Sequence, residues 1–208
     1  MTTAQTKSAT RPTYTRSADC PDLQKTFHAF LDDLVEGSMS VEALTTALAG
    51  TIDDLSSIFR LQPSLEGQLI EFGIGAVARC NPDLKVLTRN LRLPVLSEAL
   101  QIVEMNDADR FRALTFNADL RGYKTYTPDL VILNQKTRTA HVVDAKRSVY
   151  TYDRLRLDEL QKRMKAAGLV LPDFLYKEHK RLAVSEVRVV IISADDRKTD
   201  LENGIWHL

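Results

Sequence analysis

Two aspartates and a lysine stand in a segment of this chain whose neighbouring residues are mostly apolar. The segment covers residues 126–147 and reads YTPDLVILNQKTRTAHVVDAKR. Its apolar runs, PDLVIL and AHVVDA, flank the polar connector NQKTRT, a pattern typical of a β-hairpin. If the turn is centred within QKTR, Asp129 faces Asp144 across the strand pair, and Lys146 lies on the same face because side chains alternate along a strand.

The same register pairs apolar residues across the hairpin: Leu133 with Ala140, and Val131 with Val142. Two carboxylates directly opposite each other have Cβ atoms about 5 Å apart, and like charges at that separation destabilise a strand pair. An apolar hairpin would accept the two acids if a cation lay between them. A divalent metal ion beside Lys146 would meet that need.

The composition is that of a globular protein of ordinary size. The chain has 208 residues, of which 44% are hydrophobic, enough for one domain and a small appendage. No stretch approaches the roughly 18 consecutive apolar residues that a membrane span needs. Two widely separated cysteines, Cys20 and Cys80, form no metal clip. We therefore expect a cytoplasmic protein with no membrane partner.

Charge is unevenly distributed, although the formal net charge is zero. Residues 19–71 contain ten acids and two bases, a net charge of −8, whereas residues 146–188 contain eleven bases and six acids, a net charge of +5. A run of charge is usually a solvated face. A basic half beside two carboxylates would also suit a polyanionic ligand.

The first third of the chain predicts helices and no recognisable site. Residues 1–21 predict a disordered tail rich in Thr and Ser; three bases and no acid among residues 1–18 leave a mitochondrial presequence as the alternative. Residues 22–62 predict a helical N-terminal extension, acidic on its outer side. We expect this extension to serve as a homodimer contact or as a docking layer for a protein partner.

A further helix is predicted to begin at Pro63-Ser64 and to open the main domain, residues 63–208. It is apolar around most of its circumference, which favours packing against a sheet. Three glycines on it indicate close approach to a neighbour: Gly67, Gly73 and Gly75.

The same helix carries two acids, Glu66 and Glu71. A buried carboxylate needs a partner, a proton or a metal ion. An exposed glutamate near the positive end of the helix dipole is the alternative for each of them.

The rest of the chain alternates strands and helices. Residues 84–96 and 187–193 predict strands, and residues 97–120 predict a short helix followed by a loop. Residues 151–168 predict a helix that ends at Gly168, followed by the connector LVLPDF. Its inward residues are predicted to be Leu155, Leu157, Leu160 and Met164. Both faces of the central hairpin are apolar, so we expect a mixed sheet covered by helices on both sides, in the order αβββαβ.

This order of elements resembles that of the PD-(D/E)XK nuclease superfamily, the restriction-endonuclease-like group. The resemblance lies in Pro128-Asp129, in Asp144-Ala145-Lys146 and in an acid on the preceding helix, and it covers roughly residues 64–195. It implies an α/β fold with a restriction-endonuclease-like αβββαβ core. A mixed central sheet would be flanked by helices, with the N-terminal helical extension added to it.

The resemblance also implies a metal-dependent nuclease that acts on DNA. Asp129 and Asp144 would bind Mg²⁺, or Mn²⁺ in its place, together with the Ala145 carbonyl and water. Lys146 would orient or deprotonate the attacking water, or neutralise the phosphate.

In this superfamily an acid on the preceding helix often adds a metal ligand. Glu71 is preferred for that role by its spacing from the next strand, and Glu66 remains the alternative. Residues that would contact DNA phosphates, or equally form a solvated face, are Lys124, Arg147, Arg154 and Lys162. No clear glutamine–tyrosine motif follows; Tyr150, Tyr152, Arg154 and Gln161 are nearby candidates.

Two other interpretations remain open. A protein of the same fold could bind nucleic acid or a protein partner without cleaving. The presence of Asp129, Asp144 and Lys146 weighs against this, while the zero net charge and the acidic N-terminal region weigh for it. A structural α/β domain could hold Asp129 and Lys146 as a buried ion pair, but this leaves Asp144 unexplained.

Overall fold

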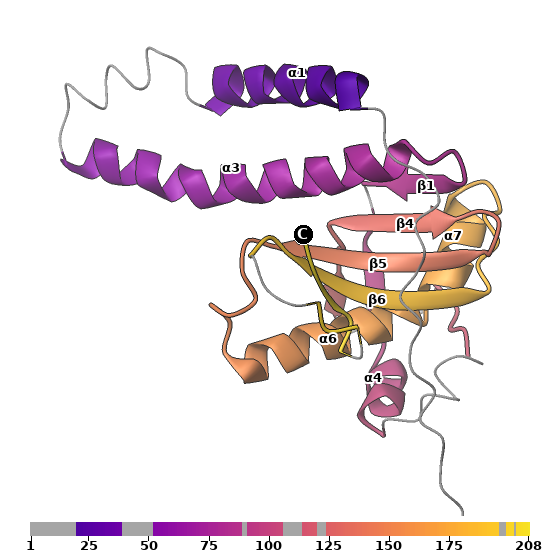
Figure 1. Ribbon diagram of the computed structural model, residues 1–208. Helices are drawn as coiled ribbons and strands as arrows, with labels where there is room; N and C mark the ends of the chain where they lie inside the picture. Colours follow the sequence, from indigo (N-terminus) through magenta and orange to yellow (C-terminus); the bar gives the residue numbers. More distant parts are fainter. Residues whose placement is uncertain are drawn as a thin grey trace, which may run out of the picture.

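Figure 1 shows the computed structural model of the chain, which describes residues 20–38, 52–88, 91–105, 114–119, 124–195, 199–201 and 203–208. These residues form the helices α1 (Cys20–Ser38), α3 (Ile52–Arg79), α4 (Ser97–Glu104), α6 (Arg154–Gly168) and α7 (Leu171–Glu178). They form the strands β1 (Leu84–Leu87), β2 (Leu93–Val95), β3 (Lys124–Tyr126), β4 (Leu130–Asn134), β5 (Thr139–Lys146), β6 (Glu186–Ser193) and β7 (Ile205–His207).

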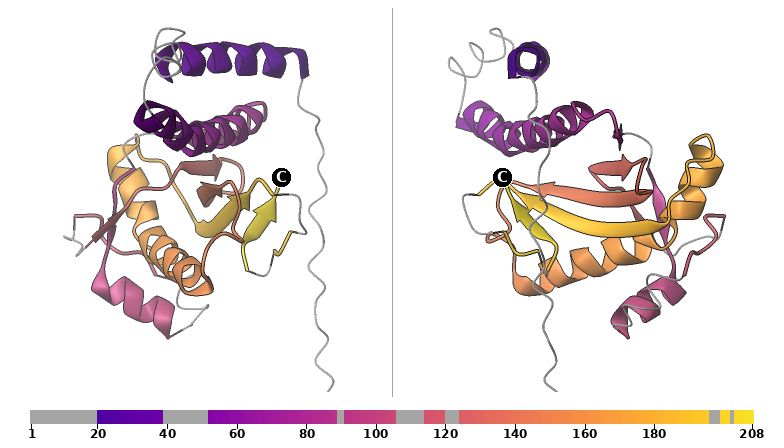
Figure 2. Two further views of the ribbon diagram at one scale, coloured as in Figure 1. Left: turned by 90° about the vertical axis from the view of Figure 1, so that its left-hand side faces the viewer. Right: turned by 45° about the vertical axis from the view of Figure 1, so that its right-hand side comes forward.

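A five-stranded sheet in the order β1-β4-β5-β6-β7 forms the centre of the protein, and β2 and β3 form a separate two-stranded sheet. β5 is antiparallel to β4 and parallel to β6, so the main sheet is mixed. Helix α3 covers one face of it, and α6 covers the other (Figures 1 and 2). The expected α/β class, with a mixed sheet between helices, is therefore confirmed.

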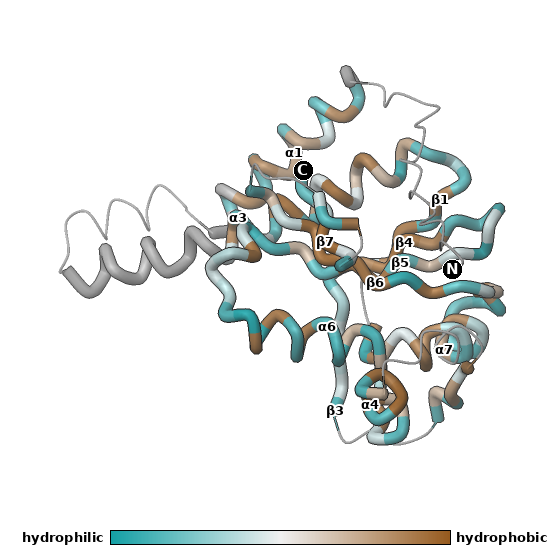
Figure 3. Tube along the Cα trace, turned by 60° about the horizontal axis from the view of Figure 1, so that its bottom comes forward, coloured by the Kyte–Doolittle hydropathy of each residue, from teal (hydrophilic) through white to brown (hydrophobic). Residues whose placement is uncertain are grey.

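The central hairpin has the register expected from the sequence. Leu133 pairs with Ala140, and Val131 pairs with Val142. Both faces of β5 are covered by packed side chains, on the α6 side and on the α3 side, which explains why its residues are apolar on both faces. Figure 3 shows these hydrophobic strands in the interior, between the more hydrophilic outer segments.

The two faces of the hairpin belong to two different clusters of buried side chains. On the α6 side, Val131 and Val142 pack in one cluster with Met164. On the α3 side, Leu130 and Val143 pack in a second cluster against Ile74 of α3. Alternation along a strand pair sends successive side chains to opposite faces, so this division follows from the register.

Helix α1 packs on the outer side of α3 through aromatic side chains. The ring of Phe30 stacks on that of Phe72 with centroids 3.8 Å apart, and Phe27 meets Phe72 edge-on at 5.6 Å. Of the helices described, none is both long enough and apolar enough to cross a lipid bilayer.

The expected helix start at Pro63 is wrong, because α3 runs without a break from Ile52 to Arg79. Proline inside a helix costs about 3 kcal/mol relative to alanine, so proline is found more often at the start of a helix than in its interior. This preference is not absolute, and α3 continues through Pro63. The expected domain boundary between residues 62 and 63 thus falls inside a helix. The expected disordered tail and part of the helical extension, residues 1–19 and 39–51, lie outside the described residues.

The single strand expected over residues 84–96 is also wrong. Its two ends belong to different sheets, with β1 beside β4 and β2 beside β3. Pro94 lies in the short two-stranded sheet, where a missing N–H disturbs a ladder least. Leu91, Leu93 and Val95 are buried in the cluster on the α6 side. The alternation of apolar and polar residues in this part of the sequence therefore reflects the burial of one face of β2 and of Leu91 before it.

Four features of the C-terminal half differ from expectation. Leu155 is 71% exposed and does not face inward, and Gly168 is the last residue of α6, with Leu169 as its C-cap. The expected connector LVLPDF instead contributes to α7, whose first turn holds Pro172. Proline is favoured in the first turn of a helix, because its missing N–H has no partner there. The short strand β7 was not expected at all.

The glycines of α3 differ in their surroundings. A Cβ atom added at Gly73 would stand 3.1 Å from the ring of Phe27, so the expected close approach is confirmed there. At Gly75 the nearest atoms belong to the side chain of Arg79 on the same helix, and at Gly67 nothing lies within 4 Å. For Gly67 the expectation of a close neighbour is wrong.

We predict opposite effects for alanine at two glycines. Gly67→Ala should raise the free energy of unfolding by about 1 kcal/mol, since helix propensity improves and space is free. Gly204→Ala should lower it by at least about 1 kcal/mol, because Gly204 has φ +66° and an added Cβ atom would lie 2.8 Å from the carbonyl oxygen of Val189. Urea unfolding of both variants checks this; the same sign of change for both would contradict it.

Candidate functional site

The start of β4 and the end of β5 meet at one edge of the main sheet, because the two strands are antiparallel. The first residue pair of their ladder is Leu130 with Val143. Asp129 immediately precedes β4, and Asp144 and Lys146 lie in the last three residues of β5. The fold thus brings both aspartates and the lysine to this edge.

Asp129 is held by the backbone of the neighbouring strand. The N–H of Ala145 donates a hydrogen bond to Oδ2 of Asp129 over 2.7 Å. Burial and the charge of Asp144 raise the pKa of Asp129 above its ordinary value, and the Ala145 hydrogen bond and Lys146 offset only part of that rise. Asp129 is therefore a carboxylate whose ionised form is disfavoured in this structure.

Asp144 is 5% exposed and has two different environments at its two oxygens. The hydroxyl of Tyr126 donates to Oδ2 over 2.9 Å. Oδ1 forms an ion pair with the ammonium group of Lys146, and no other described residue gives this buried atom a hydrogen bond. One oxygen is fixed by a neutral donor, and the other is directed at positive charge.

Tyr126 is a site residue that the sequence interpretation missed. It comes from β3, outside the main sheet, and is 7% exposed. Burial, the charge of Asp144 and the hydrogen bond to Asp144 raise the pKa of the Tyr126 hydroxyl far above its ordinary value, so the hydroxyl stays a proton donor. The available signal was weak: a buried tyrosine needs a hydrogen-bonding partner, but the sequence does not say which one.

Lys146 keeps its proton despite its partial burial. Burial alone would lower the pKa of its ammonium group. The charges of Asp144 and Asp129, together with the hydrogen bond to Asp144, raise that pKa by more. Lys146 is therefore a positive charge and a hydrogen-bond donor at neutral pH.

Glu71, on α3, lies within electrostatic range of the same group. Burial and then the charge of Asp129 raise the pKa of Glu71, Lys146 opposes the rise, and Asp144 adds to it. Glu66 instead forms an ion pair with Arg147, Oε2 to Nη1, over 3.1 Å. Of the two glutamates, the geometry favours Glu71 as the third acid of the site.

A groove of about 740 Å³ borders the acids. Glu71 and Asp129 lie on its wall, and the rest of its lining comes mainly from α1 and α3, including the aromatic rings of Phe30 and Phe72 and the guanidinium of Arg79. This groove gives a ligand access to Glu71 and Asp129 from the α3 side of the sheet, whereas Asp144 and Lys146 are not among its lining residues.

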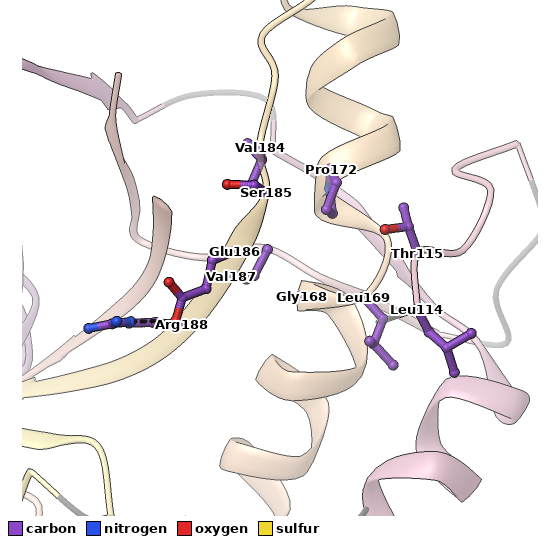
Figure 4. Close-up of a pocket in the computed structure, with 10 residues that line it drawn as sticks. All are labelled: Leu114, Thr115, Gly168, Leu169, Pro172, Val184, Ser185, Glu186, Val187 and Arg188. Carbon is purple, nitrogen blue, oxygen red and sulfur yellow. Dashed lines mark hydrogen bonds and ion pairs between the residues drawn. The ribbon is translucent and has the colours of Figure 1, made fainter. Parts of the chain in front are cut away.

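A second hollow, of about 540 Å³, lies where β6 begins and α6 meets α7 (Figure 4). Its charged lining residues, Glu186 and Arg188, form an ion pair over 2.9 Å. None of the residues expected in the catalytic site lines it, so we assign the functional site to the groove beside Glu71 and Asp129.

The four cations expected to contact phosphates are dispersed. Arg147 directly follows β5 at the edge of the site. Arg154 is exposed and begins α6, and Lys124 is exposed on β3. Lys162 forms an ion pair of 3.9 Å with Glu104 of α4, so its side chain is directed at that helix.

A second polar cluster beyond the end of β5 was also missed. Ser148 and Ser193 both donate to the carboxylate of Asp195, over 2.8 and 2.6 Å. Nδ1 of His207 lies 2.7 Å from Oδ1 of Asp195. Burial alone would raise the pKa of Asp195, but these hydrogen bonds lower it below its ordinary value. Because both serines bond to Asp195 and, among the described residues, neither bonds to His207, the cluster is not arranged as a serine nucleophile with a histidine base.

The donor set fits a hard divalent cation such as Mg²⁺, which prefers carboxylate and carbonyl oxygens. Oδ1 of Asp144 is buried and paired with an ammonium group, and nearby negative charge raises the cost of ionising Asp129, through Asp144, and Glu71, through Asp129 and Asp144. Among the described residues, no three His, Cys, Asp or Glu side chains gather closely enough to enclose an ion. The fit is therefore to a site with two protein carboxylates, Asp129 and Asp144, with Glu71 near them.

Comparisons of the chain with models of protein families, with curated proteins and with solved structures found no match. The assignment to a nuclease superfamily stays a prediction that depends on the residues and geometry described above.

We predict that Asp129→Asn stabilises the metal-free protein at neutral pH. The amide oxygen of asparagine can still accept the N–H of Ala145, while the disfavoured charge is removed. The melting temperature should rise by about 2–4 °C, the shift that about 1 kcal/mol causes in a domain of this size.

The gain should shrink in acid. Because the pKa of Asp129 is raised in the folded state, the wild-type penalty is absent below the unfolded value, 3.8, and grows as the pH rises through the folded pKa. Thermal unfolding in EDTA across this range checks the effect, with Asp158→Asn, at an exposed position of α6, as the control. A lower melting temperature for Asp129→Asn at neutral pH would contradict it.

We predict that Tyr126→Phe destabilises the protein by about 1–3 kcal/mol, because Oδ2 of Asp144 loses its donor and stays buried. Urea unfolding measures the change. Tyr176→Phe, at a tyrosine that is 52% exposed on α7, is the matched control and should change stability little. Equal effects of the two substitutions would show that the Tyr126 hydroxyl does not support Asp144.

Proposed function

We propose that this chain is a metal-dependent nuclease of the PD-(D/E)XK superfamily that hydrolyses phosphodiester bonds in DNA. The observation that carries the proposal is the meeting of Asp129, Asp144 and Lys146 at one edge of an apolar sheet, with Glu71 in electrostatic range. A structural ion pair needs one carboxylate for one lysine. Three carboxylates around one ammonium carry a net charge of −2 when all are ionised, which is the charge that one divalent cation balances.

Asp129 and Asp144 would hold Mg²⁺, or Mn²⁺ in its place, with the Ala145 carbonyl and water completing the oxygen shell. Bound there, the ion would supply a lowered pKa for a water molecule and neutralise charge on the phosphate. Glu71 would add a ligand or accept a hydrogen bond from water.

Lys146 would act as a donor in this site. Its ion pair with Asp144 and its position at the end of β5 support a role in orienting the attacking water and in neutralising the phosphate. Tyr126 would keep Asp144 in place by holding Oδ2, so that Oδ1 stays directed at positive charge.

The site also has access and charge that suit a polyanion. The groove leaves Glu71 and Asp129 accessible, and its wall also carries the acid Asp33 and the cation Arg79. Arg147 stands directly after β5, and residues 146–188 carry eleven bases against six acids.

We predict that the purified chain cleaves DNA in Mg²⁺ or Mn²⁺ and not in EDTA. Incubation with labelled single-stranded, double-stranded and branched DNA, resolved by gel electrophoresis, measures this. Lys146→Ala should lower the rate by at least about 100-fold, since a positioned proton donor contributes that much or more. Lys136→Ala, at an exposed lysine of the β4–β5 turn, is the control and should cleave normally.

Two further readouts separate the parts of the proposal. Mg²⁺ should raise the melting temperature of the wild-type chain and leave Asp129→Asn unchanged, because a ligand that binds only the folded state stabilises it. Glu71→Gln should lower the cleavage rate more than Glu66→Gln, since Glu66 pairs with Arg147. No cleavage in either metal, or unchanged cleavage by Lys146→Ala, would refute the proposed activity.

A further inference from the structure

The turn that leaves the candidate site presents two tyrosine rings to solvent. Tyr150 and Tyr152 lie in the segment between β5 and α6 and are 56% and 40% exposed. Figure 1 shows this segment at the left, leading into α6. Leu155, three residues after Tyr152 in the first turn of α6, is 71% exposed. We call residues 147–155 the tyrosine turn. Large apolar side chains that gather on a surface next to a site indicate contact with a ligand or partner.

Hydrogen bonds hold the backbone of the tyrosine turn. The N–H of Tyr152 donates to the carbonyl oxygen of Val149 over 3.1 Å, and the N–H of Val149 donates to the hydroxyl of Ser193 over 3.1 Å. The hydroxyl of Thr151 donates to the carbonyl oxygen of Ser148 over 3.0 Å. The rings are therefore carried by a turn fixed to the end of β6, and ordering them would cost a ligand little entropy.

The ring of Tyr150 is also supported by a contact with His207 of β7. It stacks on the ring of His207, with centroids 6.3 Å apart and an angle of 24° between the planes. His207 is itself held by Asp195, which binds Ser148 of the turn. The second polar cluster therefore supports the ring of Tyr150 through its contact with His207.

The tyrosine turn is continuous with the candidate site and carries positive charge. Tyr152 lies six residues after Lys146, in the segment that directly follows β5. Arg147, Arg154 and Arg156 stand in or beside the turn, against one acid, Asp153, whose side chain caps α6. Exposed aromatic rings interleaved with arginines are the combination that binds single-stranded nucleic acid, with bases on the rings and phosphates on the cations.

We infer that the tyrosine turn binds unpaired bases next to the phosphate that is cut, so that the preferred substrate is single-stranded DNA. The position of that phosphate rests on the proposed function. A paired base is covered on both faces by its neighbours in the duplex and cannot stack on Tyr150 or Tyr152. An unpaired base can leave its neighbours and stack on an exposed ring, and thymine does so at little cost because thymine runs stack weakly.

Binding without cleavage tests this inference. Fluorescence anisotropy of a labelled oligothymidylate and of a duplex of the same length, both in EDTA, measures affinity for the wild-type chain and for Tyr150→Ala/Tyr152→Ala. The wild-type chain should bind the single strand more tightly. The double variant should bind it at least about tenfold more weakly, with a change of less than about twofold for the duplex, because each stacked base depends on its aromatic ring.

Tyr176→Ala is the matched control. Tyr176 is 52% exposed but lies on α7, at the opposite end of the sheet from the tyrosine turn, and its loss should leave binding unchanged (Figure 1). The inference is overturned if the wild-type chain binds the duplex as tightly as the single strand or binds neither. It is also overturned if the double variant binds the single strand like wild type, or if Tyr176→Ala weakens binding as much. Since the assay is run in EDTA, loss of stacking is distinguished from failure of the proposed cleavage.

Discussion

The burial of the Asp144 carboxylate is the constraint on which the rest of the site depends. Moving an ionised carboxylate out of water costs several kcal/mol unless hydrogen bonds and opposite charge replace the lost solvation. Here Tyr126 supplies a neutral donor to one oxygen and Lys146 supplies charge to the other. Tyr126 lies in the small β2–β3 sheet, so that sheet helps to stabilise the buried carboxylate of Asp144. Helix α6 packs against both sheets and keeps the small sheet in position.

The acids around Asp144 work against the stability of the fold. Asp129 and Glu71 each have a raised pKa, mainly because of burial; the charge of Asp144 adds to the rise for Asp129, and the charges of Asp129 and Asp144 add to it for Glu71. The two clusters of buried apolar side chains on the faces of the sheet offset that cost. A group of like charges retained at the expense of stability is typical of a functional site, where the arrangement serves binding and not folding.

The sequence predicted contacts between residues that are close in the chain better than contacts between distant segments. The hairpin register, with Leu133 opposite Ala140, follows from side-chain alternation and a short connector, and it is confirmed. The contact of Tyr126 with Asp144 could not be predicted, because β3 is not paired with β5 and no periodic pattern reports a contact between two sheets. Leu155 shows a related failure: helical spacing predicted an inward residue, but the side chain, in the first turn of α6, is exposed.

The polar cluster around Asp195 was missed for the same reason, since its members come from three separate segments. Residue types alone did suggest both aspartates and Lys146, because two acids in an apolar hairpin are unusual at any register. The choice between Glu66 and Glu71 needed the position of Arg147, which pairs with Glu66. Sequence therefore indicated the central residues of the site, while the residues that support them required the three-dimensional structure.

The parallel pairing of β5 with β6 has a consequence for the order in which the protein folds. It joins Thr139 to Glu186, which are 47 residues apart in the chain, so its loop must close before the pairing can form. The β4–β5 hairpin is local, but an isolated two-stranded hairpin is marginally stable in water, and its two facing aspartates repel each other. The acids of the site therefore become fixed neighbours only once the distant strand has docked, and a chain that has not finished folding carries them as separate, independently solvated charges.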